Sequence, residues 1–174
     1  LSGDCTVRGG ILYSTERIEL TEKSTLEGQA ISHGRIDVLS SARVRFPGVL
    51  YTVATEDSTV DRGIRISSTA EQSGSIVSLS GNGRPLRVSM AGPIVLDGKT
   101  EFTGLIYGEG AVDLNGYITG SVAARILQFE HRETTYINWL RDVVLDRTVL
   151  KNGFMLPSGF HSKVAMEMIS WTRK

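Results

Sequence analysis

The chain has 174 residues, enough for one domain or for one domain with a tail, and 40% of its residues are apolar while 22% are charged. Its 19 basic and 19 acidic side chains cancel, so the net charge gives no attraction to nucleic acid or to an anionic membrane surface. The single cysteine, Cys5, excludes an internal disulfide and a cysteine-rich zinc site, and no apolar run reaches the about 18 residues of a helical membrane span.

Two apolar triplets in the first part of the chain repeat at a separation of about 18 residues. Ile18–Leu20 aligns with Ile36–Val38, and each triplet alternates apolar, polar, apolar, which is the side-chain period of a strand. Each is followed by an apolar residue, a spacer and a glycine, "LEG" at 26–28 and "FPG" at 46–48, and then by another short apolar strand. The pattern predicts short strands separated by turns, with no helix between them.

The middle of the chain follows this pattern less regularly. Segments 56–68 and 75–90 still alternate, for example at Ile64 and Ile66. The composition of "GNGRP" at 81–85 is that of a turn. We interpret the two segments as two further repeats that carry longer loops.

The regular repeat returns after residue 93, where Ile94–Leu96 aligns with Val112–Leu114 and the glycine motifs are "FTG" at 102–104 and "YITG" at 117–120. Strands this short cannot form a stable hairpin sheet alone, but they can stack so that each repeat pairs with its neighbours. The sequence therefore predicts an all-β, right-handed parallel β-helix (β-solenoid) with rungs of about 18 residues over residues 1–129. The alternative is a β-sandwich or barrel with glycine-rich turns.

The segment 130–174 has a different character, with more charge, more aromatic residues and few glycines. Its apolar spacing fits a helix and a strand equally well. Because an open sheet end is a template for unwanted pairing, we expect this segment to cap the solenoid. Tyr136, Trp139, Phe154 and Phe160 are the side chains expected to close the apolar interior.

The repeats resemble those of the bactofilin family of bacterial cytoskeletal proteins. The resemblance rests on "LEGQAISHGRIDV" and "FTGLIYGEGAVDLNGYITGSVAARIL", which share the apolar-x-Gly, short strand and apolar-x-apolar order, and it covers about half of the chain. It implies a right-handed parallel β-helix that polymerises end to end. The irregular stretch between residues 52 and 90 and the aromatic block after 129 depart from the family pattern.

No catalytic, cofactor-binding or metal-binding residue is predicted. His33, His131 and His161 lie far apart in the sequence, and none has a second ligand at metal-binding spacing. Glu56-Asp57 and Asp61-Arg62 offer carboxylate oxygens that can coordinate calcium, but the sequence contains no EF-hand loop and no RTX nonapeptide.

Acidic residues within the triplets are the remaining candidates for chemistry. Glu19 and Asp37 occupy equivalent positions and are expected to stack about 4.8 Å apart on the outer face. Asp113 occupies the same position next to Val95. Stacked carboxylates can bind a cation or act as an acid–base pair on a polysaccharide, but a solvated strand shows the same pattern.

The function that these patterns favour is that of a non-enzymatic structural or assembly protein, which contacts copies of itself or a component of the cell envelope. The end near Leu1–Ile11 is expected to be open. The alternative is a carbohydrate-binding or polysaccharide-active β-helix protein. No nucleic-acid partner is expected, and the resemblance implies the bacterial cytoplasm or envelope. A start at Leu1 rather than Met is compatible with removal of an upstream signal or anchor.

Overall fold

The computed structural model of the protein describes residues 1–54, 62–80, 92–97, 100–132 and 134–146. These residues form an all-β protein, and none of their segments is a helix of the length and apolarity that a bilayer crossing requires. The strands are β1 (Thr6–Ser14), β2 (Arg17–Leu20), β3 (Thr25–Ser32), β4 (Arg35–Ser40), β5 (Arg43–Val44), β6 (Val49–Ala54), β7 (Gly63–Ser68), β8 (Gln72–Ser80), β9 (Ile94–Leu96), β10 (Thr100–Asp113), β11 (Gly116–His131), β12 (Thr134–Ile137) and β13 (Val143–Asp146).

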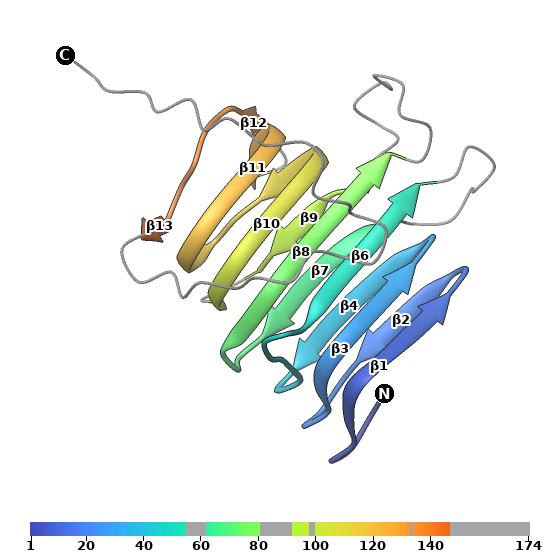
Figure 1. Ribbon diagram of the computed structural model, residues 1–174. Helices are drawn as coiled ribbons and strands as arrows, with labels where there is room; N and C mark the ends of the chain where they lie inside the picture. Colours follow the sequence, from blue (N-terminus) through green and yellow to red (C-terminus); the bar gives the residue numbers. More distant parts are fainter. Residues whose placement is uncertain (55–61, 81–91, 98–99, 133, 147–174) are drawn as a thin grey trace.

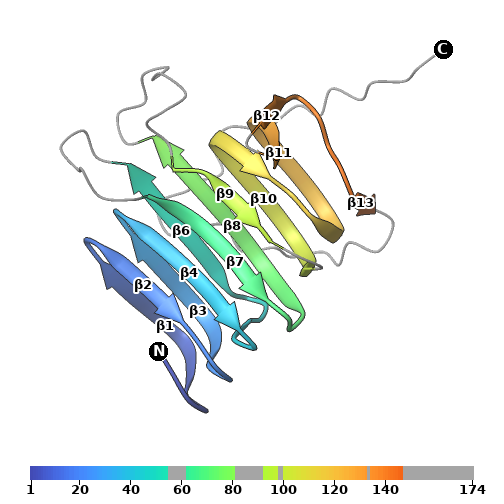
Figure 2. The same cartoon turned by 180° about the vertical axis from the view of Figure 1, so that it is seen from behind.

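The strands form one sheet that nearly closes into a barrel-like shape (Figure 1; Figure 2). One row runs β1-β3-β6-β8-β10, and the other runs β9-β7-β4-β2. The rows join at β10, whose first part pairs with β8 and whose last residues pair with β9. All of these pairings are parallel, and β11 continues the stack beyond β10.

The pairings predicted from the two regular repeats are confirmed. Ile18 pairs with Ile36, and Ile94 pairs with Val112, in the expected register. Between them Ile36 pairs with Ile64, which in turn pairs with Ile94. These two steps along the sheet take more residues than the regular repeat, because segments 55–61 and 81–91 lie between the paired strands.

The core lies between the two rows of strands. Burial alternates along β3 and β10, so every second side chain points inward, as the period of a strand requires. The inward side chains are mostly branched aliphatic residues, which pack well on a pleated surface. The largest fully buried ones are Phe102, Leu20, Leu26, Ile36, Leu50, Ile64, Ile66, Ile76, Ile94, Leu96, Ile106 and Leu114.

The repeated glycines have a structural reason that goes beyond the turn. Gly104 lies directly on Gly74, and a Cβ added to Gly104 would come within 1.8 Å of the carbonyl oxygen of Gly74. Gly120 lies on Gly104 in the same way, and its Cβ would come within 1.9 Å of the Gly104 oxygen. Both have positive φ angles, 150° and 154°. The glycine of each "x-Gly" motif therefore lets neighbouring backbones approach at one inner corner.

The C-terminal segment is described as far as Asp146. This part forms strands, not a helix. β11 runs through the predicted boundary at 129, β12 pairs with it antiparallel, and β13 pairs with its start in parallel.

The expectation that Tyr136 and Trp139 close the interior is wrong. They are 36% and 62% exposed, because β12 leaves the main stack and Tyr136 packs on Phe129 at 4.8 Å between ring centroids. Phe154 and Phe160 lie outside the described residues, and the division at residue 129 stays a prediction.

Candidate functional sites

The first candidate site is the N-terminal end of the sheet. β1 pairs with β3 on one side, and no described strand pairs with its other side. Ile11 and Tyr13 lie on the outer face of this edge strand and are 58% and 62% exposed. Val7 and Leu12 face the core, yet they are only partly buried. The backbone edge and the apolar interior are therefore both open at this end within the described residues.

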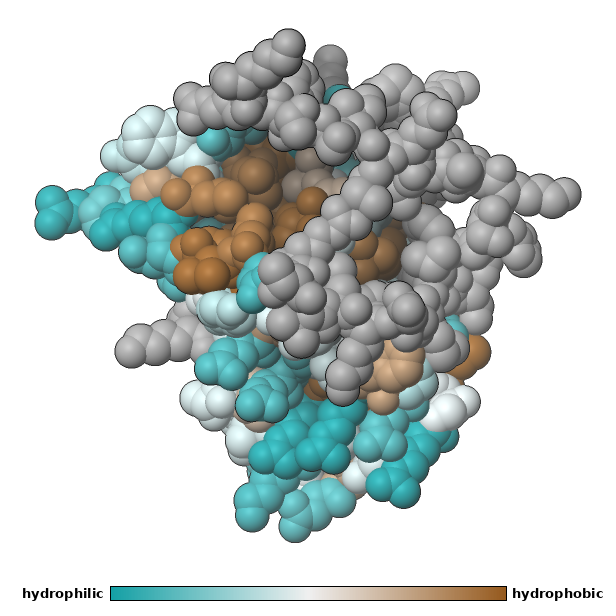
Figure 3. Space-filling model, turned by 60° about the vertical axis from the view of Figure 1, so that its left-hand side comes forward, coloured by the Kyte–Doolittle hydropathy of each residue, from teal (hydrophilic) through white to brown (hydrophobic). Residues whose placement is uncertain are grey.

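The second candidate site is the opposite end, formed by β11, β12 and β13. The core-facing side chains Val122, Leu127 and Val143 are again only partly buried. Figure 3 shows a continuous apolar surface on the side of the molecule that carries these strands. The large apolar side chains exposed at this end are Tyr136, Ile137, Trp139, Leu140, Val144 and Leu145. Incomplete burial of core side chains is thus a property that both ends share.

The acidic pair predicted from the repeat is brought together, but it is not a pair of solvated carboxylates. Glu19 pairs in register with Asp37. Asp37 is only 1% exposed, because Arg17 and Arg35 enclose it. Their Nε atoms lie 2.9 Å and 2.8 Å from its two carboxylate oxygens. Both carboxylate oxygens are thus engaged by guanidinium groups, which leaves Asp37 little access to a cation or a substrate.

Asp113 lies at the other end of the same row of side chains, in a hollow of about 300 Å³. Burial raises the pKa of its carboxyl group, and the nearby charge of Asp97 raises it further. A hydrogen bond from the backbone of Glu130 lowers the pKa, while the charge of the Glu130 side chain raises it. Asp97 itself is held by Arg65, whose Nε lies 2.6 Å from Oδ2. The described residues contain no group of three or more side chains placed to hold a metal ion.

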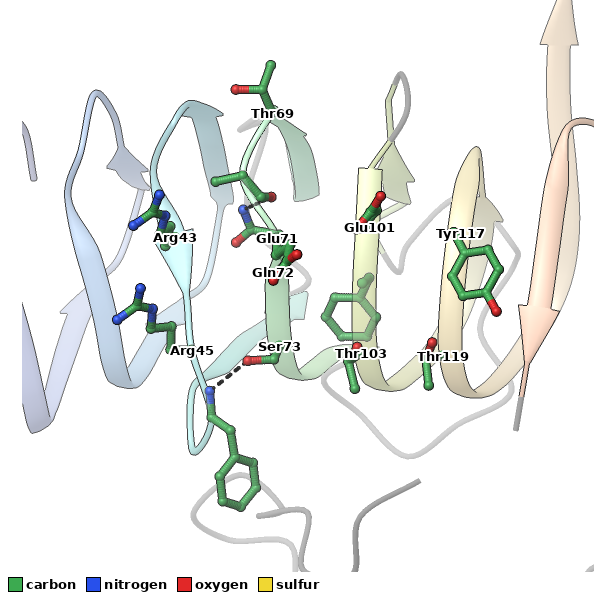
Figure 4. A pocket seen from close by; sticks show the side chains of 13 residues that line it. Arg43, Arg45, Thr69, Glu71, Gln72, Ser73, Glu101, Thr103, Tyr117 and Thr119 are labelled. Carbon is green, nitrogen blue, oxygen red and sulfur yellow. Dashed lines mark hydrogen bonds between the residues drawn. The ribbon is translucent and has the colours of Figure 1, made fainter. Parts of the chain in front are cut away.

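The third candidate site is a groove of about 860 Å³ on the outer face of β5, β8, β10 and β11 (Figure 4). Two rows of side chains run along it from strand to strand. One row contains Arg43, Glu71, Glu101 and Tyr117, and the other contains Arg45, Ser73, Thr103 and Thr119. Its lining is mostly polar, with an exposed aromatic ring near each end, Phe46 and Tyr117.

Strand ladders join β8, β10 and β11 beneath the groove, whereas side chains hold β5 against β8. Gln72 is buried, accepts a hydrogen bond from the backbone N–H of Val44 at 2.7 Å and donates one to the carbonyl of Ala42 at 2.9 Å. Ser73 Oγ accepts a hydrogen bond from the N–H of Phe46 at 3.0 Å. At the far end, the Tyr117 hydroxyl donates to Asp146 Oδ2 at 3.0 Å, and this bond raises the pKa of the phenol. Hydrogen bonds therefore hold the backbone at Phe46 and the hydroxyl end of the Tyr117 ring.

The other residues considered from the sequence are not brought together. His33 packs edge-on against Tyr13, and His131 lies against Phe129, so the two histidines belong to different surfaces. Cys5 is half-buried, and its Sγ lies 3.1 Å from the carbonyl oxygen of Ser2. His161 and residues 56, 57 and 61 lie outside the described residues.

The groove was not found from the sequence, although a signal for it exists. The residues one and three positions before each repeated glycine point outward, and these positions hold Glu71 and Ser73, Glu101 and Thr103, and Tyr117 and Thr119. Alignment on Gly74, Gly104 and Gly120 therefore lists the groove side chains in order. Gly74 belongs to the middle segment, where the repeat is hardest to see.

A scan against protein-family models, a search of curated proteins and a search of solved structures each found no match to this chain.

Proposed function

We propose that the protein is a non-enzymatic structural protein that self-associates through the ends of its sheet, and that it is a right-handed parallel β-solenoid of the bactofilin type with rungs of about 18 residues. The support for the solenoid is the parallel register of the two regular repeats and the stacked glycines between neighbouring strands. Right-handed connections are the rule between parallel strands. The resemblance in sequence implies a bacterial protein of the cytoplasm or the envelope.

The observation that carries the proposal is the state of the core at the two ends. Among the described residues, the partly buried apolar side chains that pack against the core come from the end strands: Val7, Leu12, Val122, Ala124, Leu127 and Val143. A second copy placed on either end would bury them and pair the open strand edge. Because contacts at two different ends need not close into a ring, such an assembly is open-ended.

The N-terminal end is the primary contact in this proposal, because β1 combines an unpaired backbone edge with exposed Ile11 and Tyr13. Each copy that adds there gains backbone hydrogen bonds as well as apolar burial.

Sedimentation velocity over a concentration series tests the proposal. We expect the wild type to show species larger than a monomer as concentration rises, and the double substitution Ile11→Lys and Tyr13→Lys to suppress them, because charge on an edge strand opposes strand addition. A matched control with two lysines at exposed positions in the middle of the sheet, Thr69→Lys and Thr103→Lys, keeps the net charge of the variant and should associate like the wild type. A wild type that stays monomeric at the highest concentration contradicts the proposal.

A further inference from the structure

The groove on β5, β8, β10 and β11 has three properties of a binding site for an extended polar chain. It is long, because its side chains come from four neighbouring strand positions; it is lined mainly by hydroxyl and charged groups; and its shape is set by the hydrogen bonds of Gln72, Ser73 and Tyr117. A site that is already ordered loses little conformational entropy when a ligand binds.

The spacing along the groove selects the kind of polymer. Ser73, Thr103 and Thr119 are paired in register, so their hydroxyl groups repeat at the strand separation of about 4.8 Å. Each pyranose ring lengthens an extended β-linked glycan by a similar distance. Successive sugars of such a chain therefore lie beside successive hydroxyl groups of this row of the protein. An extended peptide repeats its side chains every two residues at about 6.6 Å, which does not match this row.

The charged side chains and the aromatic rings of the groove indicate which kind of glycan fits it. Glu71 and Glu101 lie in the middle of the groove, where their carboxylates accept hydrogen bonds well from sugar hydroxyls. Arg43 in β5 and Arg45 just after it balance their charge. The lining therefore has no net charge to attract a polyanion, which favours an uncharged chain. Tyr117 and Phe46 are 43% and 49% exposed and lie near opposite ends of the groove. Exposed rings give a sugar face an apolar surface to stack on, and the hydroxyl of Tyr117 keeps its ring in place through Asp146.

We propose that this groove binds an uncharged β-linked glycan segment about three sugars long, with the chain running across the strands from Phe46 to Tyr117. The length follows from the three strand separations between β5 and β11, about 14 Å in total. The hydroxyl groups of Ser73, Thr103 and Thr119 and the carboxylates of Glu71 and Glu101 bond to the sugar hydroxyls, while the two rings stack on the terminal sugars. The site does not include β1, so binding is independent of the proposed assembly through that edge.

Isothermal titration calorimetry with cellotetraose, chitotetraose and the acidic tetragalacturonate tests the proposal. We expect at least one of the two uncharged tetrasaccharides to bind and the acidic one not to bind. Tyr117→Ala should weaken that binding at least tenfold, and Thr103→Val, which removes a hydroxyl group at nearly constant volume, should weaken it severalfold. Tyr13→Ala removes a ring at the N-terminal edge and should leave the affinity unchanged. Circular dichroism shows whether each variant is folded.

Three outcomes overturn the proposal: no binding of either uncharged tetrasaccharide at millimolar concentration, tighter binding of tetragalacturonate, or binding that a folded Tyr117→Ala variant retains. If Tyr117→Ala does not fold, Thr103→Val and Thr119→Val decide alone, since both hydroxyl groups lie on the outer face and outside the core. Loss of self-association in Tyr13→Ala with unchanged glycan binding would separate this site from the assembly contact.

Discussion

At the scale of single residues, Asp37 shows how an outward-facing acid becomes structural. Its carboxylate is 1% exposed and receives a guanidinium group from Arg17 and another from Arg35. Asp37→Asn removes the charge and leaves both arginines without their shared partner, so we expect the free energy of unfolding to fall by about 1 to 3 kcal/mol. Urea denaturation measures this change. Glu19→Gln is the control, because Glu19 is half-exposed and pairs with Arg17 alone, and it should cost less than about 1 kcal/mol. Equal losses would contradict this account.

Unlike the carboxylate of Asp37, the ionised carboxylate of Asp113 is expected to destabilise the folded state. Its folded pKa is raised above the ordinary value of 3.8, first by burial and then by Asp97. The unfolded chain therefore releases this proton at a lower pH than the folded chain, so wild-type stability falls as pH rises from the unfolded pKa through the folded one. Asp113→Asn, which keeps an acceptor for the backbone of Glu130, should be more stable than the wild type at neutral pH.

Urea midpoints at about pH 7 and about pH 3 test this, since the advantage of the variant must vanish where the carboxyl group is protonated in both states. Asp4→Asn, at an exposed position, controls for the loss of one negative charge. A gain for Asp113→Asn that is the same at both pH values would show that packing, rather than ionisation, is responsible.

At the scale of strands, the stacked glycines predict a steep local cost. A Cβ at Gly104 would overlap the carbonyl oxygen of Gly74, which is backbone and cannot rotate away. We expect Gly104→Ala to lower the free energy of unfolding by more than about 3 kcal/mol. Gly9→Ala is the matched control, because Gly9 also has a positive φ, of 61°, but no atom lies within 4 Å of the added Cβ. It should cost about 1 kcal/mol, and a similar cost at both positions would refute the role assigned to close approach.

Strand pairing could be predicted from the sequence where the repeat is uninterrupted. Ile18 with Ile36 and Ile94 with Val112 are both recognisable, because an apolar residue recurs at a fixed separation and a one-residue shift would turn it outward. β8 is harder to place, since its inward positions include Gln72 and Ser78 among apolar residues. These polar side chains are tolerated inside because each bonds to backbone, Ser78 Oγ to the carbonyl of Gly92 at 2.7 Å. Hydropathy alone cannot show such a partner.

The candidate sites were less predictable than the strands for a related reason. The stacking of Glu19 on Asp37 follows from the repeat, but the enclosure of Asp37 depends on two arginine side chains whose conformations the repeat does not determine. The groove depends on four strands at once. The outward position of Thr103 is deducible from Gly104, whereas its nearness to Tyr117 requires the register between β10 and β11.

At the scale of the whole molecule, the ends of the sheet differ from its middle in the number of their partners. β7 and β8 are paired on both sides, whereas β1 and β2 each have one described partner, β3 and β4. Because a strand paired on one side can open without disturbing the rest, amide exchange should be faster in β1 and β2 than in β7 and β8. Hydrogen exchange followed by mass spectrometry resolves these segments, and equal protection throughout would mean that the sheet opens as one unit.

The same measurement connects stability to assembly. If copies add to the N-terminal edge, the amides on the outer side of β1 acquire partners, and their exchange must slow as protein concentration rises. Exchange in β7 and β8 should not change, because these strands already have both neighbours. In the Ile11→Lys and Tyr13→Lys double variant the concentration effect in β1 should disappear while the difference between β1 and β8 remains. A slowing of exchange that is equal in β1 and β8 would place the contact elsewhere.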